Sequence, residues 1–323
     1  MNLEDREMTP GKSFELLVKH ILIDVGFSEV SSDGLYIFDG PAGQMIQGLG
    51  EAHNADVLLD PPVQTPFYSK TRLLIECKNY SRKVGLNTVR SVLGLREDIN
   101  HFDMVDMHEL AARRAQNRRG VVSQHDRCSY QVAIAATNGY TTQAQKFAAT
   151  HRIPLIELTK MPFWEDFRLL LQGSGSYRNQ RGDPRNANHQ ELAVDPRIEE
   201  LADEVGRKMA VAITNSGQLL FLYRIRGGKT RFEDGYSLHW TDPLKPWRLD
   251  TGKCSYLFQL PDSIMKQWLE HSQSELDTKK TAINCKASFL SNMVVYYMDY
   301  QPRIQMISID RYELEEARKK LDK

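Results

Sequence analysis

The fold is decided by the stretch Arg72-Leu-Leu-Ile-Glu-Cys-Lys-Asn79, which is preceded by Asn54-Ala-Asp-Val-Leu-Leu59. The apolar run in the first stretch is too short for a buried helix and follows a Pro-rich turn, so it predicts a central strand that is covered on both faces. Side chains alternate along a strand. We therefore expect Glu76 and Lys78 to share one face and Cys77 to point to the other, into the packing.

A second carboxylate is expected at the same place. Asp56 opens the preceding apolar run, and it meets Glu76 if the two strands are neighbours in a hairpin. Two carboxylates with a lysine beside them make a divalent-metal site with an adjacent cation. The plainer alternative is that Glu76 and Lys78 form a cross-strand or solvated ion pair. Burying them beside so apolar a strand costs several kcal/mol unless pairing or a metal offsets it, which favours a functional site.

Several motifs together resemble a known nuclease superfamily. They are Gly11-Lys-Ser-Phe-Glu15, Gly48-Leu-Gly-Glu-Ala-His-Asn-Ala-Asp56, Glu76-Cys77-Lys78 and Ala133-Ile-Ala-Ala-Thr-Asn-Gly-Tyr-Thr-Thr-Gln-Ala144. Over roughly residues 10 to 160 the chain resembles the PD-(D/E)xK nucleases, and most closely their Mrr-type restriction endonuclease branch. That branch often has glycine before the aspartate, where this chain has Ala55, and the proline of the superfamily name is absent. Neither departure removes a metal ligand.

This resemblance implies an α/β fold with a restriction-endonuclease-like mixed sheet flanked by helices. It implies a Mg²⁺-dependent endonuclease that hydrolyses DNA phosphodiester bonds, with Mn²⁺ as a substitute metal, in prokaryotic restriction or anti-phage defence. Asp56, Glu76 and the backbone carbonyl of Cys77 would hold the ion. Lys78 would orient or activate the attacking water and offset charge in the transition state. Glu15, on an earlier amphipathic helix, would position a metal-bound water.

Other functions stay open at this point. One is an RNA-directed or signal-gated effector nuclease, because a site that cuts the backbone does not reveal whether the substrate is DNA or RNA. Another is a catalytically silent nucleic-acid-binding protein of the same fold, although the intact Asp56, Glu76 and Lys78 argue against it. A defence-system partner protein or a signal ligand would bind the C-terminal domain. Homo-oligomerisation is left open.

Composition narrows the class of protein. The chain has 323 residues, 41% hydrophobic and 26% charged, with no apolar stretch that approaches a membrane span. Its acidic N-terminus lacks the features of a signal peptide, so we expect a cytoplasmic protein. Four scattered cysteines without a CxxC pair indicate neither disulfides nor a zinc ribbon. Lys+Arg and Asp+Glu both number 42, so contact with a nucleic acid requires a local basic patch.

The chain divides into three parts by pattern. We expect a catalytic domain over 1–172, a flexible linker over 173–190 that is poor in large apolar residues, and a smaller α+β recognition or regulatory domain over 191–323. Within the first part, the pattern predicts helices over 13–25, 87–100, 143–150 and 162–172, a glycine-rich loop over 40–50, and strands over 130–137 and 155–158 joined in parallel by crossover helices.

Two further groups of residues allow a plain and a functional interpretation. The segment 101–130 contains Arg113, Arg114, Arg118 and Arg119, which predict either a phosphate-binding arm or a solvated surface. In the C-terminal part, Tyr236, Trp240, Trp247 and Tyr256 fit either a ligand pocket or, as we favour, the core between strands. His53, in the glycine-rich region, is a candidate metal ligand or general base, but a single loop histidine is more often neither.

Overall fold

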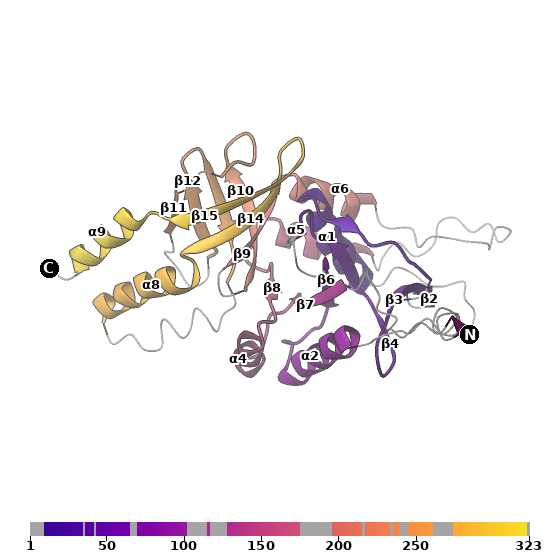
Figure 1. Cartoon of the computed structure of the whole chain (residues 1–323). Helices are drawn as coiled ribbons and strands as arrows, with labels where there is room; N and C mark the ends of the chain where they lie inside the picture. The colour runs from indigo at the N-terminus through magenta and orange to yellow at the C-terminus, as the bar shows by residue number, and fades with distance from the viewer. Residues whose placement is uncertain are drawn as a thin grey trace.

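The structure is a computed structural model of the whole chain (Figure 1). The residues it describes are 10–34, 36–41, 43–64, 70–101, 115–116, 128–174, 196–214, 217–232, 235–239, 245–260 and 274–321.

A five-stranded sheet forms the centre of the N-terminal part. Its strands, in the order β1-β5-β6-β7-β8, are β1 (Ser28–Glu29), β5 (Val57–Asp60), β6 (Lys70–Lys78), β7 (Cys128–Ala136) and β8 (Leu155–Glu157). β5 runs antiparallel to β6, whereas β6, β7 and β8 are parallel to one another. The predicted central strand, its hairpin partner and the parallel strands that follow are therefore confirmed, and the protein is a mixed α/β structure.

Helices cover both faces of this sheet (Figure 1). They are α1 (Pro10–Asp24), α2 (Leu86–His101), α4 (Thr142–Thr150) and α5 (Trp164–Ser174). Leu73, Ile75 and Cys77 of β6 share one buried cluster with residues of α1 and α5. Leu74 belongs to another cluster, with residues of α2 and α4. This alternation confirms that β6 is covered on both sides and that Cys77 points into the packing.

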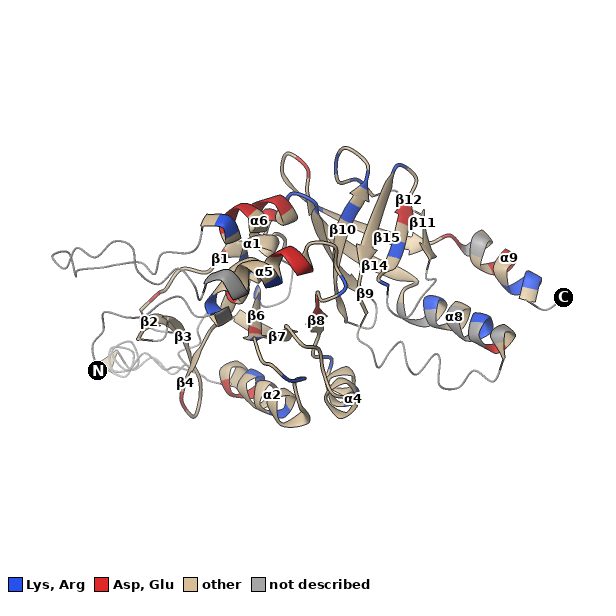
Figure 2. Cartoon of the chain, turned by 180° about the vertical axis from the view of Figure 1, so that it is seen from behind, with Lys and Arg blue, Asp and Glu red and all other residues tan. Residues whose placement is uncertain are grey.

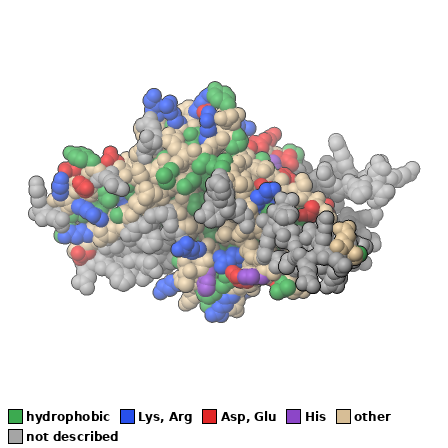
Figure 3. All heavy atoms as spheres, in the orientation of Figure 1, with side chains coloured by type: hydrophobic (Ala, Val, Ile, Leu, Met, Phe, Trp, Pro, Cys, Tyr) green, Lys and Arg blue, Asp and Glu red, His purple; other side chains and the backbone are tan. Residues whose placement is uncertain are grey.

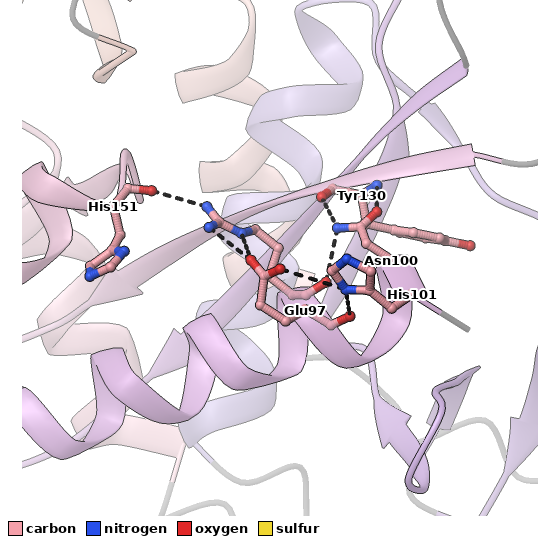
Figure 4. A network of polar contacts seen from close by, with 6 residues as sticks. Glu97, Asn100, His101, Tyr130 and His151 are labelled. Atoms are coloured by element: carbon pink, nitrogen blue, oxygen red, sulfur yellow. Dashed lines mark hydrogen bonds and ion pairs between the residues drawn. The ribbon is translucent and has the colours of Figure 1, made fainter. Parts of the chain in front are cut away.

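Hydrogen bonds fix the end of α2 against the sheet (Figure 4). The side chain of Asn100 accepts from the backbone N–H of Tyr130 at 2.8 Å and donates to the carbonyl oxygen of the same residue at 2.9 Å. Arg96 donates to the carbonyl oxygen of His151 at 3.0 Å. Because these hydrogen bonds join α2 to β7 and to the end of α4, they fix the position of α2 beside the end of β6.

The expectation of a loop over 40–50 is wrong. A small antiparallel sheet lies there, made of β2 (Ile37–Gly40), β3 (Gly43–Gln47) and β4 (Ala52–Asn54). The glycines mark its turns, as at Gly43 with φ +123°, and strands too short for a clear alternation lie between them. Ile46 of β3 is 1% exposed and joins the core, so tertiary packing outweighs the local turn preference.

The C-terminal part is a closed barrel with helices beside it. Around the barrel the order is β10 (Leu219–Arg226), β13 (Cys254–Phe258), β12 (Trp247–Thr251), β11 (Gly235–His239), β15 (Pro302–Ile309), β14 (Asn292–Met298) and β9 (Met209–Thr214). The helices are α6 (Pro196–Gly206), α8 (Glu275–Phe289) and α9 (Arg311–Leu321). Tyr236, Trp247 and Tyr256 are buried in the barrel core, which confirms the core interpretation for these three, whereas Trp240 lies outside the described residues.

The two halves share a hydrophobic core. One buried cluster contains residues of α1, α5 and β6 together with Ile198 of α6 and Val211 of β9. α6 is rich in Asp and Glu (Figure 2). The predicted linker begins inside α5, which extends to Ser174, and its remainder lies outside the described residues. The division into domains stays a prediction. None of the helices in the described ranges is long and apolar enough to cross a membrane.

Candidate active site

The predicted site residues meet at the ends of β5 and β6. Val57 pairs with Ile75 across the two antiparallel strands, so Asp56 and Glu76, one residue further on, come to the same end of the hairpin. Asp56 accepts the backbone N–H of Cys77 through Oδ2 at 2.8 Å. Asn54 donates to Oδ1 of Asp56 at 2.9 Å. Two hydrogen bonds therefore fix the Asp56 carboxylate in place.

Glu76 and Lys78 form an ion pair on the same face of β6. Their side chains are only 18% and 19% exposed. Burial, and after it the charge of Asp56, raises the pKa of the Glu76 carboxyl. Burial acts to lower the pKa of Lys78, but the hydrogen bond from Lys78 to Glu76 and the charges of Glu76 and Asp56 outweigh it, so this pKa is raised. Lys78 is therefore an ammonium ion at neutral pH.

Glu15 approaches the same site from α1. Its carboxylate pairs with Lys12, one turn earlier, at 2.6 Å. Burial raises the pKa of Glu15, and the charges of Asp56 and Glu76 raise it further, against the effect of Lys12. These mutual effects mean that Glu15, Asp56 and Glu76 interact electrostatically. The structure thus brings Asp56, Glu76 and Lys78 together at the end of the hairpin, and Glu15 on α1 lies within electrostatic reach of the two carboxylates.

Cys77 contributes its backbone and not its thiol. The side chain is buried on the opposite face of β6. Burial, together with the charges of Asp56 and Glu15, raises the pKa of the thiol well above its ordinary value, so the sulfur stays protonated and unreactive.

A pocket of about 480 Å³ opens beside Glu76 and Lys78. Its lining comes from β6, from the segment around β4, from Tyr80 and from one side of α2. The lining residues are Glu51, His53, Glu76, Lys78, Tyr80, Asn87, Thr88, Ser91, Val92 and Leu95. Hydroxyl and amide side chains thus face an ion pair across an open space, which suits a polar substrate. Asp56 and Glu15 are not part of this lining.

The sequence did not predict that α2 lines the pocket, nor that His53 pairs with a residue of that helix. His53, which lies on β4 and not in a loop, pairs with Asp98 of α2 at 2.7 Å. The motif around Gly48 pointed to the region of His53, but nothing in the sequence linked it to an aspartate 45 residues later. The tentative nucleic-acid contacts Arg113, Arg114, Arg118 and Arg119 lie outside the described residues.

The donor set can be tested against a divalent metal. Within the described residues, no group of three or more His, Cys, Asp or Glu side chains is close enough together to hold a metal ion. The carboxylates of Asp56 and Glu76 and the carbonyl of Cys77 nevertheless supply the hard oxygen ligands that suit Mg²⁺, an ion that usually keeps several of its waters. Asp56 raises the pKa of Glu76, and a bound cation would relieve that repulsion. The residues therefore fit a metal of this class.

Comparisons with known proteins add no function. No family model and no curated protein matches the chain. A solved structure described as "Crystal Structure of Protein of Unknown Function AF1548" is similar, with 17% sequence identity and a TM-score of 0.30. The match covers 51% of this chain and 66% of that chain, slightly less than two thirds. At this TM-score the likeness carries no argument about fold or function.

Proposed function

We propose that the chain is a metal-dependent endonuclease of the PD-(D/E)xK type that hydrolyses DNA phosphodiester bonds. The observation that carries this proposal is the meeting of Asp56, Glu76 and Lys78 at one end of the β5–β6 hairpin. The hairpin lies in a mixed sheet with helices on both faces, as a restriction-endonuclease-like core requires. Prokaryotic restriction or anti-phage defence is the setting that the resemblance suggests.

Asp56, Glu76 and the carbonyl of Cys77 would hold Mg²⁺, with Mn²⁺ as a substitute. When bound, the ion supplies Lewis-acid polarisation of the phosphate and a more acidic water. The hydrogen bonds from Asn54 and from the N–H of Cys77 orient Asp56 before anything binds. Because the Asp56 carboxylate is already held in place, it needs little rearrangement during the reaction.

Lys78 acts as a fixed positive charge. Because its pKa is raised, it does not take a proton from water near pH 7. It donates hydrogen bonds to the attacking water or to a phosphate oxygen, and it offsets the negative charge that develops on the phosphoryl group. Glu15 would orient a water at the rim of the site from α1.

A local basic surface would hold the substrate, since the whole chain has a formal net charge of zero. Lys, Arg and His side chains gather at the lower edge of the molecule, over α2 and α4 (Figure 3). The exposed cations in this region include Arg82, Lys83, Arg90 and Lys146. Arg82 and Lys83 follow Tyr80 of the pocket, and Arg90 lies on α2 between two pocket residues. Phosphates on both sides of the cut would meet these cations.

Cleavage assays with different substrates and metals test this function. The purified protein is incubated with supercoiled plasmid, linear duplex DNA and RNA, each with Mg²⁺, Mn²⁺ or EDTA. We expect DNA to be cut with either metal and to stay intact with EDTA. RNA cut in preference to DNA would reassign the substrate, and no cleavage of any of the three would overturn the proposal.

One observation favours a second candidate, a nuclease gated by a signal ligand. A pocket of about 460 Å³ lies where the end of α1 and the end of α6 meet the barrel, and its lining includes three cations, Arg207, Arg224 and Lys229, and two acids, Asp24 and Asp299. A ligand there would contact both the barrel and the helix that carries Glu15. The same plasmid assay, repeated with small anionic metabolites, tests this: cleavage that appears only with such a ligand would support gating.

A further inference from the structure

A histidine–aspartate pair stands at the edge of the candidate active site. Nε2 of His53 lies 2.7 Å from Oδ2 of Asp98. The two side chains are 18% and 23% exposed, so the contact is shielded from solvent more than an ordinary surface pair. The hydrogen bond from His53, followed by that from the backbone of Gly50, lowers the pKa of Asp98, which therefore carries a negative charge at neutral pH.

The turn before His53 is held in place by hydrogen bonds to Asp98. The backbone N–H of Gly50 donates to Oδ1 of Asp98 at 2.9 Å, and the N–H of Leu49 donates to the carbonyl oxygen of Asp98 at 3.3 Å. A Cβ atom on Gly48 would stand 2.1 Å from Oδ2 of Asp98 and 2.7 Å from the carbonyl oxygen of Glu51. Only glycine fits there, so the turn before β4 is shaped to bring His53 onto this carboxylate.

This arrangement leaves the other ring nitrogen for the pocket. His53 lines the pocket together with Glu76 and Lys78. Its Nε2 is engaged by Asp98, and within the described residues the ring makes no second hydrogen bond. Nδ1 is therefore the ring nitrogen that is able to meet a bound substrate.

We propose that His53 is the general acid that protonates the leaving oxygen when the phosphodiester is cut, and that Asp98 is its positioning residue. The inference rests on the proposed nuclease function. Asp98 is not one of the proposed metal ligands, and its carboxylate accepts the Nε2–H of the ring, which fixes the orientation of the ring and leaves Nδ1 for the substrate. Lys78 is held in an ion pair with Glu76, so it fills the electrostatic role beside the proposed metal.

The step balances as follows. The oxygen of a water molecule forms a bond to phosphorus, and the bond from phosphorus to the bridging oxygen breaks, with its electron pair passing to that oxygen. The leaving oxygen takes the proton from Nδ1 of His53, which becomes neutral, and the products are an alcohol and a phosphate monoester. The proton of the attacking water goes to solvent, from which the ring recovers its own.

A substrate whose leaving group needs no proton tests this assignment. The linkage that the wild-type protein cuts in a defined DNA duplex is mapped first, and the ends of the products show which bridging oxygen leaves. A second duplex carries sulfur at that bridging position, since a thiolate leaves without protonation. Single-turnover rates are then measured on both duplexes for the wild type and for His53→Gln, whose amide reaches Asp98 without a transferable proton.

We expect His53→Gln to cut the all-oxygen duplex about 10²–10⁴-fold more slowly than the wild type and to cut the sulfur duplex within about threefold of it. Equal losses on both duplexes would overturn the general-acid role, as would the absence of loss on either. Wild-type protein that cuts no DNA at all would instead remove the proposed function, so the two failures are distinguishable.

Two further variants separate the loss of the general acid from a general loss of folding. Asp98→Asn keeps the ring and one acceptor oxygen, and we expect a smaller loss, about tenfold, that sulfur again rescues; a loss that sulfur does not rescue would contradict the positioning role. His20→Gln is the matched control, because His20 also faces a carboxylate, Asp203 at 3.5 Å, but lies outside the pocket. It should match the wild type on both duplexes.

Discussion

Replacing the Asp56 carboxylate separates its catalytic role from its structural one. Asp56→Ala leaves the N–H of the buried Cys77 without its acceptor, which stands at 2.8 Å, and removes the acceptor of Asn54. An unsatisfied buried donor costs about 1–3 kcal/mol. Because Asn54 is half-buried and water reaches it more easily, we expect the loss to come chiefly from Cys77 and to total about 2 kcal/mol of unfolding free energy.

Asp56→Asn should be far milder, for a reason visible in the structure. The new amide oxygen accepts the N–H of Cys77, and its NH₂ group then faces the NH₂ group of Asn54. Oδ1 of Asn54 is a buried atom without a hydrogen-bond partner in the part of the chain that the structure describes. If the Asn54 amide turns over, that oxygen accepts the new donor and both hydrogen bonds survive.

The expected change for Asp56→Asn is therefore within about 1 kcal/mol, since weaker uncharged hydrogen bonds are offset by relief of repulsion with Glu76. Urea unfolding in EDTA measures both variants, and DNA cleavage should be lost in both. Asp60→Asn on the same strand, an acid outside the site that pairs with Arg72, is the activity control. Asp56→Asn as destabilised as Asp56→Ala would refute the reasoning about Asn54.

Three further outcomes are expected. Glu15→Gln should raise the unfolding free energy at pH 7. Folding raises the pKa of the Glu15 carboxyl above its ordinary value of 4.5. The stability that Glu15 contributes is therefore present below pH 4.5 and is lost as the pH rises through the pKa of the folded state. Thermal melts should show the gain of the variant shrinking below that pH. Lys78→Ala should slow cleavage about a hundredfold or more, with calorimetric Mn²⁺ affinity equal to the wild type or higher, because the lost cation opposed the metal. Replacing Arg82, Lys83 and Arg90 by alanine should flatten the plot of log K for DNA binding against log[salt] by about 0.9 per lost phosphate contact.

For each of these three predictions, one result would contradict it. A Glu15→Gln protein no more stable than the wild type at pH 7 would contradict the repulsion among the carboxylates. For comparison, Glu165→Gln should not stabilise, because the pKa of Glu165 is lowered by its hydrogen bond with Arg168. Lost Mn²⁺ binding in Lys78→Ala would make that lysine structural. An unchanged salt slope in the triple variant would move the phosphate contacts elsewhere.

The core of the sheet and the meeting of Asp56, Glu76 and Lys78 were predictable because both depend on local patterns. The apolar run before Glu76 has the length and composition of a buried strand, and strand alternation alone places Glu76 and Lys78 together. Asp56 followed from the hairpin. These inferences needed only the neighbouring strand, so no distant contact was able to overturn them.

What was not predictable depends on contacts between distant parts of the chain. Asp98 lies on the polar side of α2, where an aspartate ordinarily faces solvent, and only the folded chain brings it to His53. The three-stranded sheet around Ile46 was not predicted, because the glycines in this segment favour a loop. The closed barrel rests on the pairing of β11 with β15, two strands about 70 residues apart, which no local pattern encodes.

The most direct test of the central claim is the single-turnover rate of DNA cleavage by Glu76→Gln, compared with the wild type in Mg²⁺. The variant keeps the shape of the side chain and removes the charge that is proposed to hold the metal. The account predicts cleavage at least about a thousandfold slower, by a protein that is folded and melts no lower than the wild type in EDTA. Cleavage at the wild-type rate by this variant would contradict the assignment of the site at the end of β5 and β6.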